Sequence, residues 1–188
     1  MILLSIDPGS HVSGVALWKD GKLITAAAIK NTMEGSGPRE CANVAMHILD
    51  WVKKNILVKD VSSWALLDEI AVEWPQIYQR GDGKTKGDPN VNLPLAAVNG
   101  AVAALFPRVP VIAYRPHDWK QGIGKPKKVS ETYAIEGKVR VRLSSEELKA
   151  FEANWPKNVH HSWDLVDSVG VGLHHLGRFE RKRIFARE

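Results

Sequence analysis

The first thirty residues contain three short apolar runs separated by turns. The runs are ILLSI, VSGVALW and LITAAAI, and the pieces between them, PGS and KDGK, have the composition of tight turns. Apolar runs of this length, bounded by Gly, Pro and Asp, are typical of β-strands, and connections this short join antiparallel neighbours. The start of the chain therefore predicts a three-stranded antiparallel meander.

The next part of the chain alternates between helical and extended patterns. One face of a helix is predicted by apolar residues at spacings of three and four, namely Val44, Ala45, Ile48, Leu49, Val52 and Ile56. A short apolar run at residues 70–72 and the run VPVIAY predict two more strands, with a helix over residues 91–106 between them. This alternation predicts an α/β protein with a five-stranded mixed sheet flanked by helices.

The remaining segments carry weaker signals. Residues 80–90, RGDGKTKGDPN, show no periodicity and are predicted to form a mobile loop. Ser144 and Glu147 have the capping-box spacing that opens a helix, and a last helix is expected from about residue 162 to residue 178. The sequence assigns no role to residues 129–160.

Composition narrows the class of protein. With 188 residues and 44% apolar content, the chain suits a single domain over residues 1–188, with a basic tail from about residue 178. The net charge of +5 favours a polyanionic partner. The single cysteine, Cys41, excludes an internal disulfide and a thiolate-rich zinc cluster. No apolar stretch looks like a signal peptide or approaches the roughly 20 residues of a membrane span. We expect a cytoplasmic protein that does not enter a membrane.

Four acidic residues occupy places where a carboxylate needs an explanation. Asp7 and Glu73 each end a predicted strand, and Asp164 and Asp167 stand three apart on the last predicted helix, so their β-carbons lie roughly 5–6 Å apart. If the strands are neighbours and the helix packs over them, the four carboxylates meet and repel one another. Hard divalent cations such as Mg²⁺ relieve such repulsion, and two of them roughly 3.5–4 Å apart are the machinery of many nucleases.

Each acid also has a simpler explanation. Asp7 could form the turn with Pro8 and Gly9, because Asp is a common turn residue. Asp164 and Asp167 could simply favour the start of a helix through its dipole. Glu73 is harder to explain in this way, because Glu is disfavoured in strands and is rarely buried unpaired. The order of two strand acids followed by two helix acids favours the metal site.

Four stretches resemble the RuvC-type Holliday junction resolvases of the ribonuclease H-like superfamily. IDPGSHVSGVALW resembles the first hairpin of that family, and AVEWPQIY resembles its fourth strand with the catalytic Glu. YRPHDWKQGIGK is similar to the lysine-bearing segment after strand five, and HSWDLVDSVGVGLHHLGR to the closing helix. The resemblance covers most of residues 1–125 and 160–178, and its details look closest to bacteriophage-encoded forms.

The resemblance implies a ribonuclease H-like fold and a metal-dependent crossover junction endodeoxyribonuclease. It implies two Mg²⁺ ions per active site, which Mn²⁺ would replace, held by four ligands: Asp7, Glu73, Asp164 and Asp167. Lys120 would act near the scissile phosphate, and either Lys125 or Lys128 would be the second catalytic lysine. A homodimer would nick a four-way DNA junction symmetrically, leaving 5′-phosphate and 3′-hydroxyl ends, in DNA recombination and repair. The location would be the host cytoplasm if the protein is phage-encoded.

Further residues are candidates for DNA binding. Arg80, Lys84 and Lys86 lie in the loop after Glu73, and Lys125, Lys127 and Lys128 lie in the lysine-rich stretch after Lys120. Tyr78 is a candidate to stack on junction bases, because the position that carries the family's aromatic residue holds Gln76, although a packed tyrosine is an equal alternative. His160 or His161 could serve as a general base or ligand. The basic tail could contact further DNA arms or be ordinary surface charge; its members are Arg178, Arg181, Lys182 and Arg183.

Three alternatives stay open at this point. Another nuclease of the same superfamily, acting on RNA·DNA hybrids, flaps or forks, would share the same acids. A non-catalytic junction-binding protein would not need all four of them. A nucleotide-binding module of the actin and sugar-kinase type usually needs two lobes, for which 188 residues are too few, and it would leave Asp164 and Asp167 unexplained.

Overall fold

The predicted meander opens the structure. The computed structural model describes residues 1–35, 37–56, 67–75, 78–79, 85–86, 89–123 and 131–179. Its first three strands pair antiparallel in chain order; they are β1 (Ile2–Asp7), β2 (Val12–Lys19) and β3 (Lys22–Lys30). Asp20 and Gly21 between β2 and β3 have φ values of 51° and 77°. An Asp-Gly pair adopts such positive φ values at little cost, which explains the tight turn.

Two parallel strands complete the main sheet. β4 (Glu69–Glu73) pairs with β1, and β7 (Val111–Tyr114) pairs with β4, so the strand order is β3-β2-β1-β4-β7. Because β1, β4 and β7 run in the same direction, they end at the same edge of the sheet, which we call the carboxyl edge. β2 begins and β3 ends there as well. The expected five-stranded mixed α/β sheet is confirmed.

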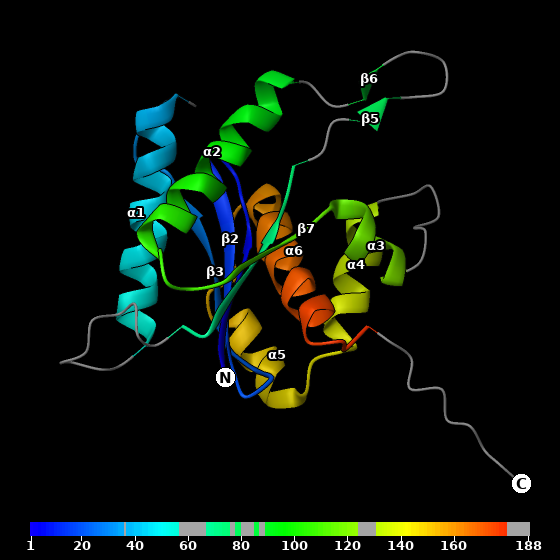
Figure 1. Cartoon of the computed structure of the whole chain (residues 1–188). Helices are drawn as coiled ribbons and strands as arrows, with labels where there is room; N and C mark the ends of the chain where they lie inside the picture. The colour runs from blue at the N-terminus through cyan, green and yellow to red at the C-terminus, as the bar shows by residue number, and fades with distance from the viewer. Residues whose placement is uncertain are drawn as a thin grey trace, which may run out of the picture.

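Helices cover both faces of this sheet (Figure 1). α1 (Pro38–Asn55) and α2 (Pro89–Leu105) pack together on one face. The other face carries α6 (Val159–His175), which contacts β1, β2 and β4, and with it α3 (Pro116–Ile123), α4 (Glu131–Arg140) and α5 (Ser145–Glu152). Leu4 and Ile6 of β1 face α1, and Leu3 faces α6; all three are fully buried. Burial on both faces explains why β1 is a continuous apolar run.

Some boundaries differ from the sequence-based prediction. The predicted loop over residues 80–90 is wrong in part, because it contains β6 (Thr85–Lys86), which pairs with β5 (Tyr78–Gln79), and the start of α2. Residues 129–160 include α4 and α5. The capping box is confirmed, since Ser144 Oγ accepts from Glu147 N at 3.3 Å and Ser144 N donates to Glu147 Oε2 at 2.8 Å. Among the described helices, none has the length and apolar character needed to cross a bilayer.

Glu147 and Arg178 tie the end of the chain to α5 and the β2–β3 turn. Glu147 is only 5% exposed and accepts from Leu23 N at 2.9 Å and from Arg178 Nη1 at 2.6 Å. Burial raises the pKa of Glu147, but hydrogen bonds from Arg178 and from backbone amides outweigh it and lower the pKa to about 2. Arg178 is therefore a structural anchor and not ordinary surface charge, while a contact with DNA stays a prediction.

The last helix begins at Val159, three residues earlier than expected. The position of this helix over the sheet depends on Gly14. Gly14 is the residue of β2 that pairs with Asp7 of β1. A β-carbon at Gly14 would lie 1.8 Å from the carbonyl oxygen of Asp164, so the backbone of α6 rests directly on this glycine. Only a residue without a side chain allows this approach, which places Asp164 beside Asp7.

We predict that Gly14→Ala destabilises the protein, because the added methyl group forces α6 away from β2. The expected loss is about 1–3 kcal/mol of unfolding free energy, measured by urea denaturation. Gly137→Ala in α4 is the matched control, since a β-carbon there meets nothing within 4 Å. The control should be neutral or stabilising by up to about 1 kcal/mol, as expected for Gly to Ala in a helix. Equal stability of Gly14→Ala and the wild type would contradict the close approach.

Candidate active site

The four predicted acids come together at the carboxyl edge. Asp7 is the last residue of β1 and Glu73 is the last residue of β4, and these strands are parallel neighbours with Ile6 opposite Val72. α6 crosses the same edge and contributes Asp164 and Asp167 from consecutive turns. The side chains of Glu73 and Asp167 are only 14% and 19% exposed. Residues far apart in the sequence therefore form one partly buried acid cluster, by which we mean Asp7, Glu73, Asp164 and Asp167.

The acid cluster is electrostatically unfavourable. Burial raises the pKa of Asp7 well above its usual value, and the negative charges of Glu73, Asp167 and Asp164 raise it further. Burial also raises the pKa of Glu73 and of Asp167. For Asp164, burial and then the charge of Asp167 raise the pKa to about 7. The cluster is thus a site that gains stability from a bound positive charge.

Lys120 supplies one positive charge to this cluster. Its Nζ lies 2.7 Å from Asp167 Oδ2 and 3.4 Å from Glu73 Oε2. Burial lowers the pKa of Lys120, but the charges of Asp167, Glu73 and Asp7 outweigh burial and raise its pKa above the usual value. Lys120 therefore stays protonated, and α3 holds it at the acids, where the sequence predicted a lysine near the reacting phosphate.

Trp119, which the sequence did not single out, orients Glu73. Its Nε1 donates a hydrogen bond to Glu73 Oε2 at 2.5 Å, and its side chain is fully buried. The indole ring packs against Gly170 of α6, where a β-carbon would lie 2.4 Å from the ring. Lys120 Nζ also lies 4.7 Å from the centroid of this ring. Two sequence features could have revealed this contact: Gly170 in the last helix, and a tryptophan directly before Lys120.

Asn99 of α2 was also missed, and it holds Glu73 from the opposite face of the sheet. Asn99 is 2% exposed, and its Nδ2 donates to the backbone oxygen of Glu73 at 3.0 Å. The amide of Trp74 donates to the carbonyl oxygen of Tyr114 at 2.7 Å, which extends the pairing of β4 with β7 beyond Glu73. The backbone and the side chain of Glu73 are therefore both fixed.

The donor set of the acid cluster suits a hard divalent cation. Four carboxylates offer oxygen ligands only, which Mg²⁺ prefers and which soft metals do not. In the part of the chain that the structure describes, no group of three or more acid, histidine or cysteine side chains is already arranged around a metal position. Lys120 instead bridges Glu73 and Asp167. The residues fit Mg²⁺ in their chemistry, and the metal stays a prediction.

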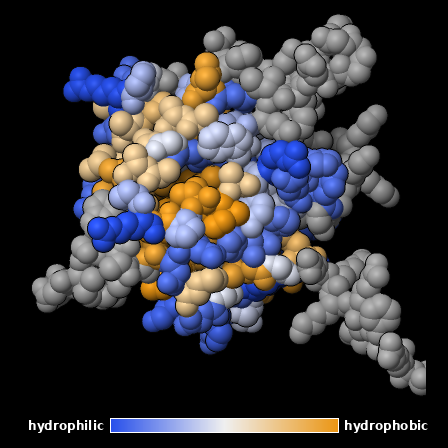
Figure 2. All heavy atoms as spheres, in the orientation of Figure 1, coloured by the Kyte–Doolittle hydropathy of each residue, from blue (hydrophilic) through white to orange (hydrophobic). Residues whose placement is uncertain are grey.

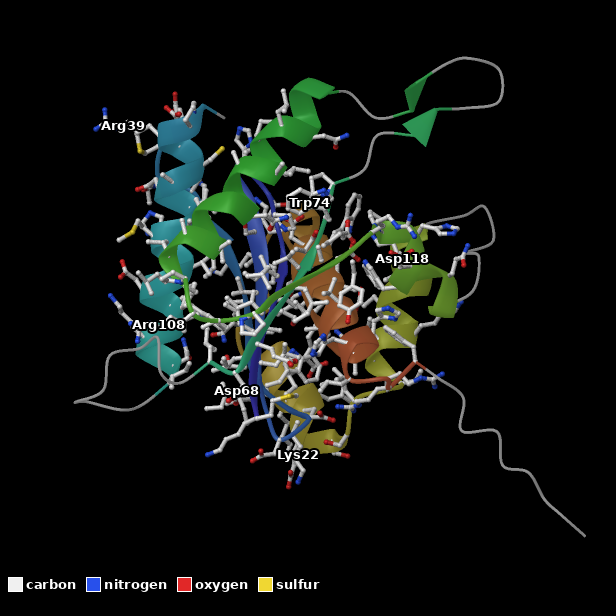
Figure 3. The ribbon with its side chains drawn as sticks, viewed as in Figure 1. Lys22, Arg39, Asp68, Trp74, Arg108 and Asp118 are labelled. Atoms are coloured by element: carbon white, nitrogen blue, oxygen red, sulfur yellow. The ribbon has the colours of Figure 1, made fainter. Side chains whose placement is uncertain are left out.

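Two exposed tryptophans lie next to the acids in sequence. Trp74 follows Glu73 and is 43% exposed, and Trp163 precedes Asp164 and is 42% exposed. Figure 3 shows Trp74 at the edge of the sheet where β4 ends. Tyr78 was the aromatic candidate from the sequence, and both tryptophans were overlooked. A large exposed aromatic residue next to a reactive site is a candidate platform for nucleic-acid bases.

Most predicted DNA-binding residues lie outside the described part of the chain. This applies to Arg80, Lys84, Lys125, Lys127 and Lys128, and also to Arg181, Lys182 and Arg183 of the tail. The backbones of Tyr78 and Lys86 pair in the β5–β6 ribbon, while their side chains and that of His160 lie outside the described set. His161 is described, one helical turn before Asp164. DNA-contact roles for these residues stay predictions.

The raised pKa of Asp164 predicts a pH dependence of stability in the metal-free protein. A carboxyl group whose folded pKa is raised stabilises the fold when protonated, and this stability is lost as pH rises from about 4 towards about 7. The protein in EDTA should therefore be less stable at about pH 8 than at about pH 5.5 in urea denaturation. Asp164→Asn should reduce that difference by roughly 1–3 kcal/mol, because it removes the ionisable group.

Asp50→Asn, at an exposed acid of α1, serves as the control and should leave the difference unchanged. A metal-free protein that is equally stable at both pH values would contradict the raised pKa.

Comparisons with known proteins were made at the levels of sequence and structure. No family model and no curated protein sequence matches the chain. The structure is similar to T. thermophilus RuvC in complex with a Holliday junction substrate, with a TM-score of 0.57 and 21% identity over 93% of this chain and 92% of that one.

Two other resolvases have similar structures. The yeast mitochondrial Holliday junction resolvase gives a TM-score of 0.58 at 14% identity, over 94% of this chain and 79% of that one. The fowlpox virus Holliday junction resolvase gives 0.52 at 15% identity, over 96% of this chain and 100% of that one. The chain therefore has the ribonuclease H-like fold of the RuvC-type Holliday junction resolvases, as its sequence motifs predicted.

Proposed function

We propose that this protein is a metal-dependent endonuclease that resolves four-way DNA junctions by paired nicks. The observation that carries the proposal is the acid cluster at the carboxyl edge, with Lys120 bound between Glu73 and Asp167. The similarity to three Holliday junction resolvases, one of them in complex with its junction, supports the choice of substrate. The net charge of +5 is consistent with a DNA partner.

The chemistry follows from the charges at the site. Mg²⁺ ions bound by the four carboxylates would supply the positive charge that a phosphodiester needs and would activate the attacking water. Asp7 and Asp164, once ionised, would be ligands of these ions, while Trp119 and Asn99 keep Glu73 in place. Lys120 would turn its ammonium group from Asp167 to a phosphate oxygen and stabilise the charge that develops there. Hydrolysis would leave a 5′-phosphate and a 3′-hydroxyl.

Branched DNA would be recognised partly through Trp74 and Trp163. When a four-way junction is opened, the base pairs at its crossing point lose a stacking neighbour on one side. Each base that stacks on an aromatic side chain contributes about 1–3 kcal/mol. Both tryptophans are more than 40% exposed and flank the acid cluster in the sequence, after Glu73 and before Asp164. This arrangement favours a substrate with unstacked bases beside the scissile phosphate.

The test of this proposal is cleavage of a set of synthetic substrates in Mg²⁺: a four-way junction, a linear duplex, a flap and an RNA·DNA hybrid. We expect the junction to be cut by symmetric nicks in preference to the others. Asp7→Asn should lower the rate by about a thousandfold or more, because it removes a charged ligand of the reaction centre. Asp50→Asn, at an exposed acid far along α1, should cut at the wild-type rate.

Three outcomes would overturn the proposed function. If the junction stays uncut, or if Asp7→Asn cuts as fast as the wild type, the acid cluster is not a nuclease centre. Preferred cutting of the RNA·DNA hybrid or of the flap would instead show another nuclease with the same fold.

We further propose that the active form is a homodimer, because a two-fold symmetric junction requires two nicks. We assign the interface to an apolar face on the described surface of α2. Leu93, Ala97, Gly100 and Ala104 recur at spacings of four and three along α2 and are all exposed, with Leu93 at 67%. Val111 of the neighbouring edge strand β7 is 38% exposed. Figure 2 shows apolar residues gathered over α2. Small side chains on this face would let α2 helices of two copies approach closely.

We predict that Ala97→Glu shifts the dimer to a monomer, because the substitution places two like charges in a small apolar interface. Sedimentation analysis in dilute solution measures this shift. Ala153→Glu, at another exposed alanine next to the end of α5, is the matched control and should remain a dimer. A wild-type protein that is monomeric at micromolar concentration, or an Ala97→Glu variant that stays dimeric, would contradict the assignment of this face.

A further inference from the structure

One buried asparagine of α2 has a hydrogen-bond partner at only one end of its side chain. Asn99 is 2% exposed, and its Nδ2 donates to the backbone oxygen of Glu73 at 3.0 Å. Among the residues that the structure describes, its Oδ1 is the one buried side-chain nitrogen or oxygen atom without a hydrogen-bond partner. The amide cannot turn over, because its oxygen would then face the oxygen of Glu73. A buried acceptor without a partner destabilises a fold, so its presence needs an explanation.

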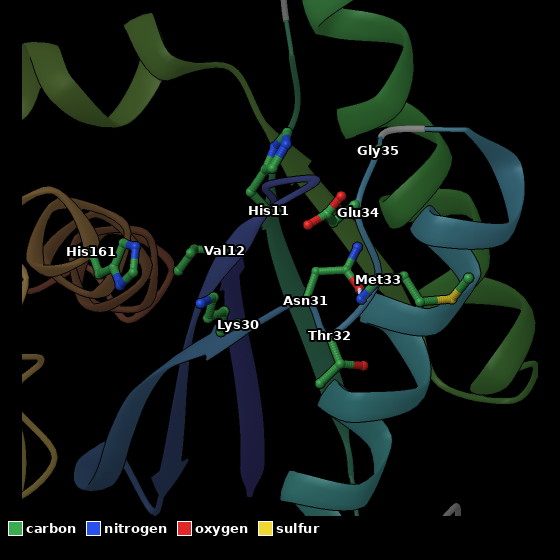
Figure 4. A pocket seen from close by; sticks show the side chains of 9 residues that line it. All are labelled: His11, Val12, Lys30, Asn31, Thr32, Met33, Glu34, Gly35 and His161. Carbon is green, nitrogen blue, oxygen red and sulfur yellow. Dashed lines mark hydrogen bonds between the residues drawn. The ribbon is translucent and has the colours of Figure 1, made fainter.

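Asn31 shows that this fold can satisfy a buried asparagine completely. Asn31 is 6% exposed and borders a pocket of about 780 Å³ where β2 begins and β3 ends (Figure 4). Its Nδ2 donates to the backbone oxygens of Ser10 at 2.9 Å and Glu40 at 3.2 Å. Its Oδ1 accepts from Met33 N at 3.0 Å and from Asn43 Nδ2 at 2.8 Å. Both polar atoms of this side chain have partners, as expected of a residue whose role is structural.

The hydrogen bond from Asn99 falls on a peptide group that lies between two candidate functional side chains. The oxygen of this group belongs to Glu73, and its N–H belongs to Trp74. Trp74 N donates to Tyr114 O at 2.7 Å, so α2 holds one polar atom of the group and the end of β7 holds the other. A peptide group is planar, so these two bonds together fix the α-carbons on either side of it. The carboxylate of Glu73 and the exposed indole of Trp74 extend from those two α-carbons.

The surroundings of Asn99 explain why its second end has no partner. Val98 and Val102 of the same helix are fully buried, so an apolar residue would suit this position but could not donate to Glu73. A charged donor would be unfavourable in such surroundings. The neutral amide supplies the donor, and its Nδ2 cannot be present without its Oδ1. The unpaired oxygen therefore accompanies the hydrogen bond to Glu73.

We propose that Asn99 is a positioning residue for the cleavage reaction. By holding the peptide group between Glu73 and Trp74, it sets the direction of a carboxylate of the acid cluster and of the exposed indole next to it. Asn99 acts from the opposite face of the sheet and touches neither the acids' side chains nor the DNA. The unpaired Oδ1 is the loss of stability that accompanies this function. The inference rests on the proposed nuclease function and adds a residue of α2 to it.

The test variant is Asn99→Leu, which has a similar size and removes both the donor and the unpaired acceptor. Its kcat on a four-way junction in Mg²⁺ should fall about tenfold to thirtyfold, because groups that orient the ligands of a reaction centre typically contribute about 10–100-fold. The KM should rise by a smaller factor, since junction binding is spread over many contacts. The urea midpoint should stay the same or rise, because a buried acceptor without a partner is gone. Asn99→Ala removes the same two atoms with less bulk and should show the same fall in kcat.

Amide hydrogen exchange, measured by NMR in EDTA, tests the same contact without cleavage. In Asn99→Leu the Trp74 amide should exchange about tenfold faster than in the wild type, because its peptide group opens locally once it is held at one end only. The Ile70 amide, which donates to Pro110 O at 2.9 Å at the start of β4, should keep its wild-type rate. Asn31→Leu is the contrasting variant: it should lower the urea midpoint and raise both exchange rates, as the loss of a structural residue does.

Asn55→Leu, which removes a similar amide bond to Trp51 O at 2.8 Å in α1, is the control for activity and should cut at the wild-type rate. If Asn99→Leu keeps the wild-type kcat, or exchanges the Trp74 amide at the wild-type rate, the positioning inference is wrong and the nuclease function stands. Equal acceleration at Ile70 and Trp74 with a lower urea midpoint would show a structural role instead. If Asn99→Leu releases the Trp74 amide alone but the wild type cuts no substrate, the contact is real and the nuclease function fails.

Discussion

The structure depends on holding four mutually repelling carboxylates at one edge of a sheet. Burial raises the pKa of every member of the acid cluster, and Lys120 compensates only part of the charge. Such an arrangement persists only if the surrounding packing fixes it. Gly14 sets the height of α6 over the sheet, and Trp119 and Asn99 fix Glu73 from opposite faces. Because the four carboxylates repel one another, a positive charge bound among them stabilises the site.

The two sides of the acid cluster are built differently. On the β7 side, α3 supplies a buried indole and a lysine that are bound directly to the acids. On the β3 side, the ends of two strands and the first turns of α6 surround an open pocket. The β7 side of the acid cluster is therefore filled by buried and charged side chains, whereas the β3 side is open.

The fold was largely predictable because its signals are local. Turn residues such as Asp20 and Gly21, short apolar runs and a capping box at Ser144 act within a few residues of one another. Where the prediction from sequence was wrong, the cause was a contact between elements that the local sequence pattern does not show. The segment over residues 80–90 has no periodicity of its own, yet part of it pairs as a ribbon and part starts α2. Arg178 looked like surface charge, but it binds Glu147, 31 residues away in sequence.

The sequence by itself determined the succession of strands and helices along the chain, the places of the four acids and Lys120 in it, and the resemblance that pointed to this fold. These depend on residue type and spacing, which the chain displays directly. Only the tertiary structure decided that Trp119 binds Glu73 across 46 residues, that α6 rests on Gly14, and that His11, Lys30 and His161 border one pocket. The direction of a buried hydrogen bond and the space between two elements are set by how those elements pack. No local pattern records that packing.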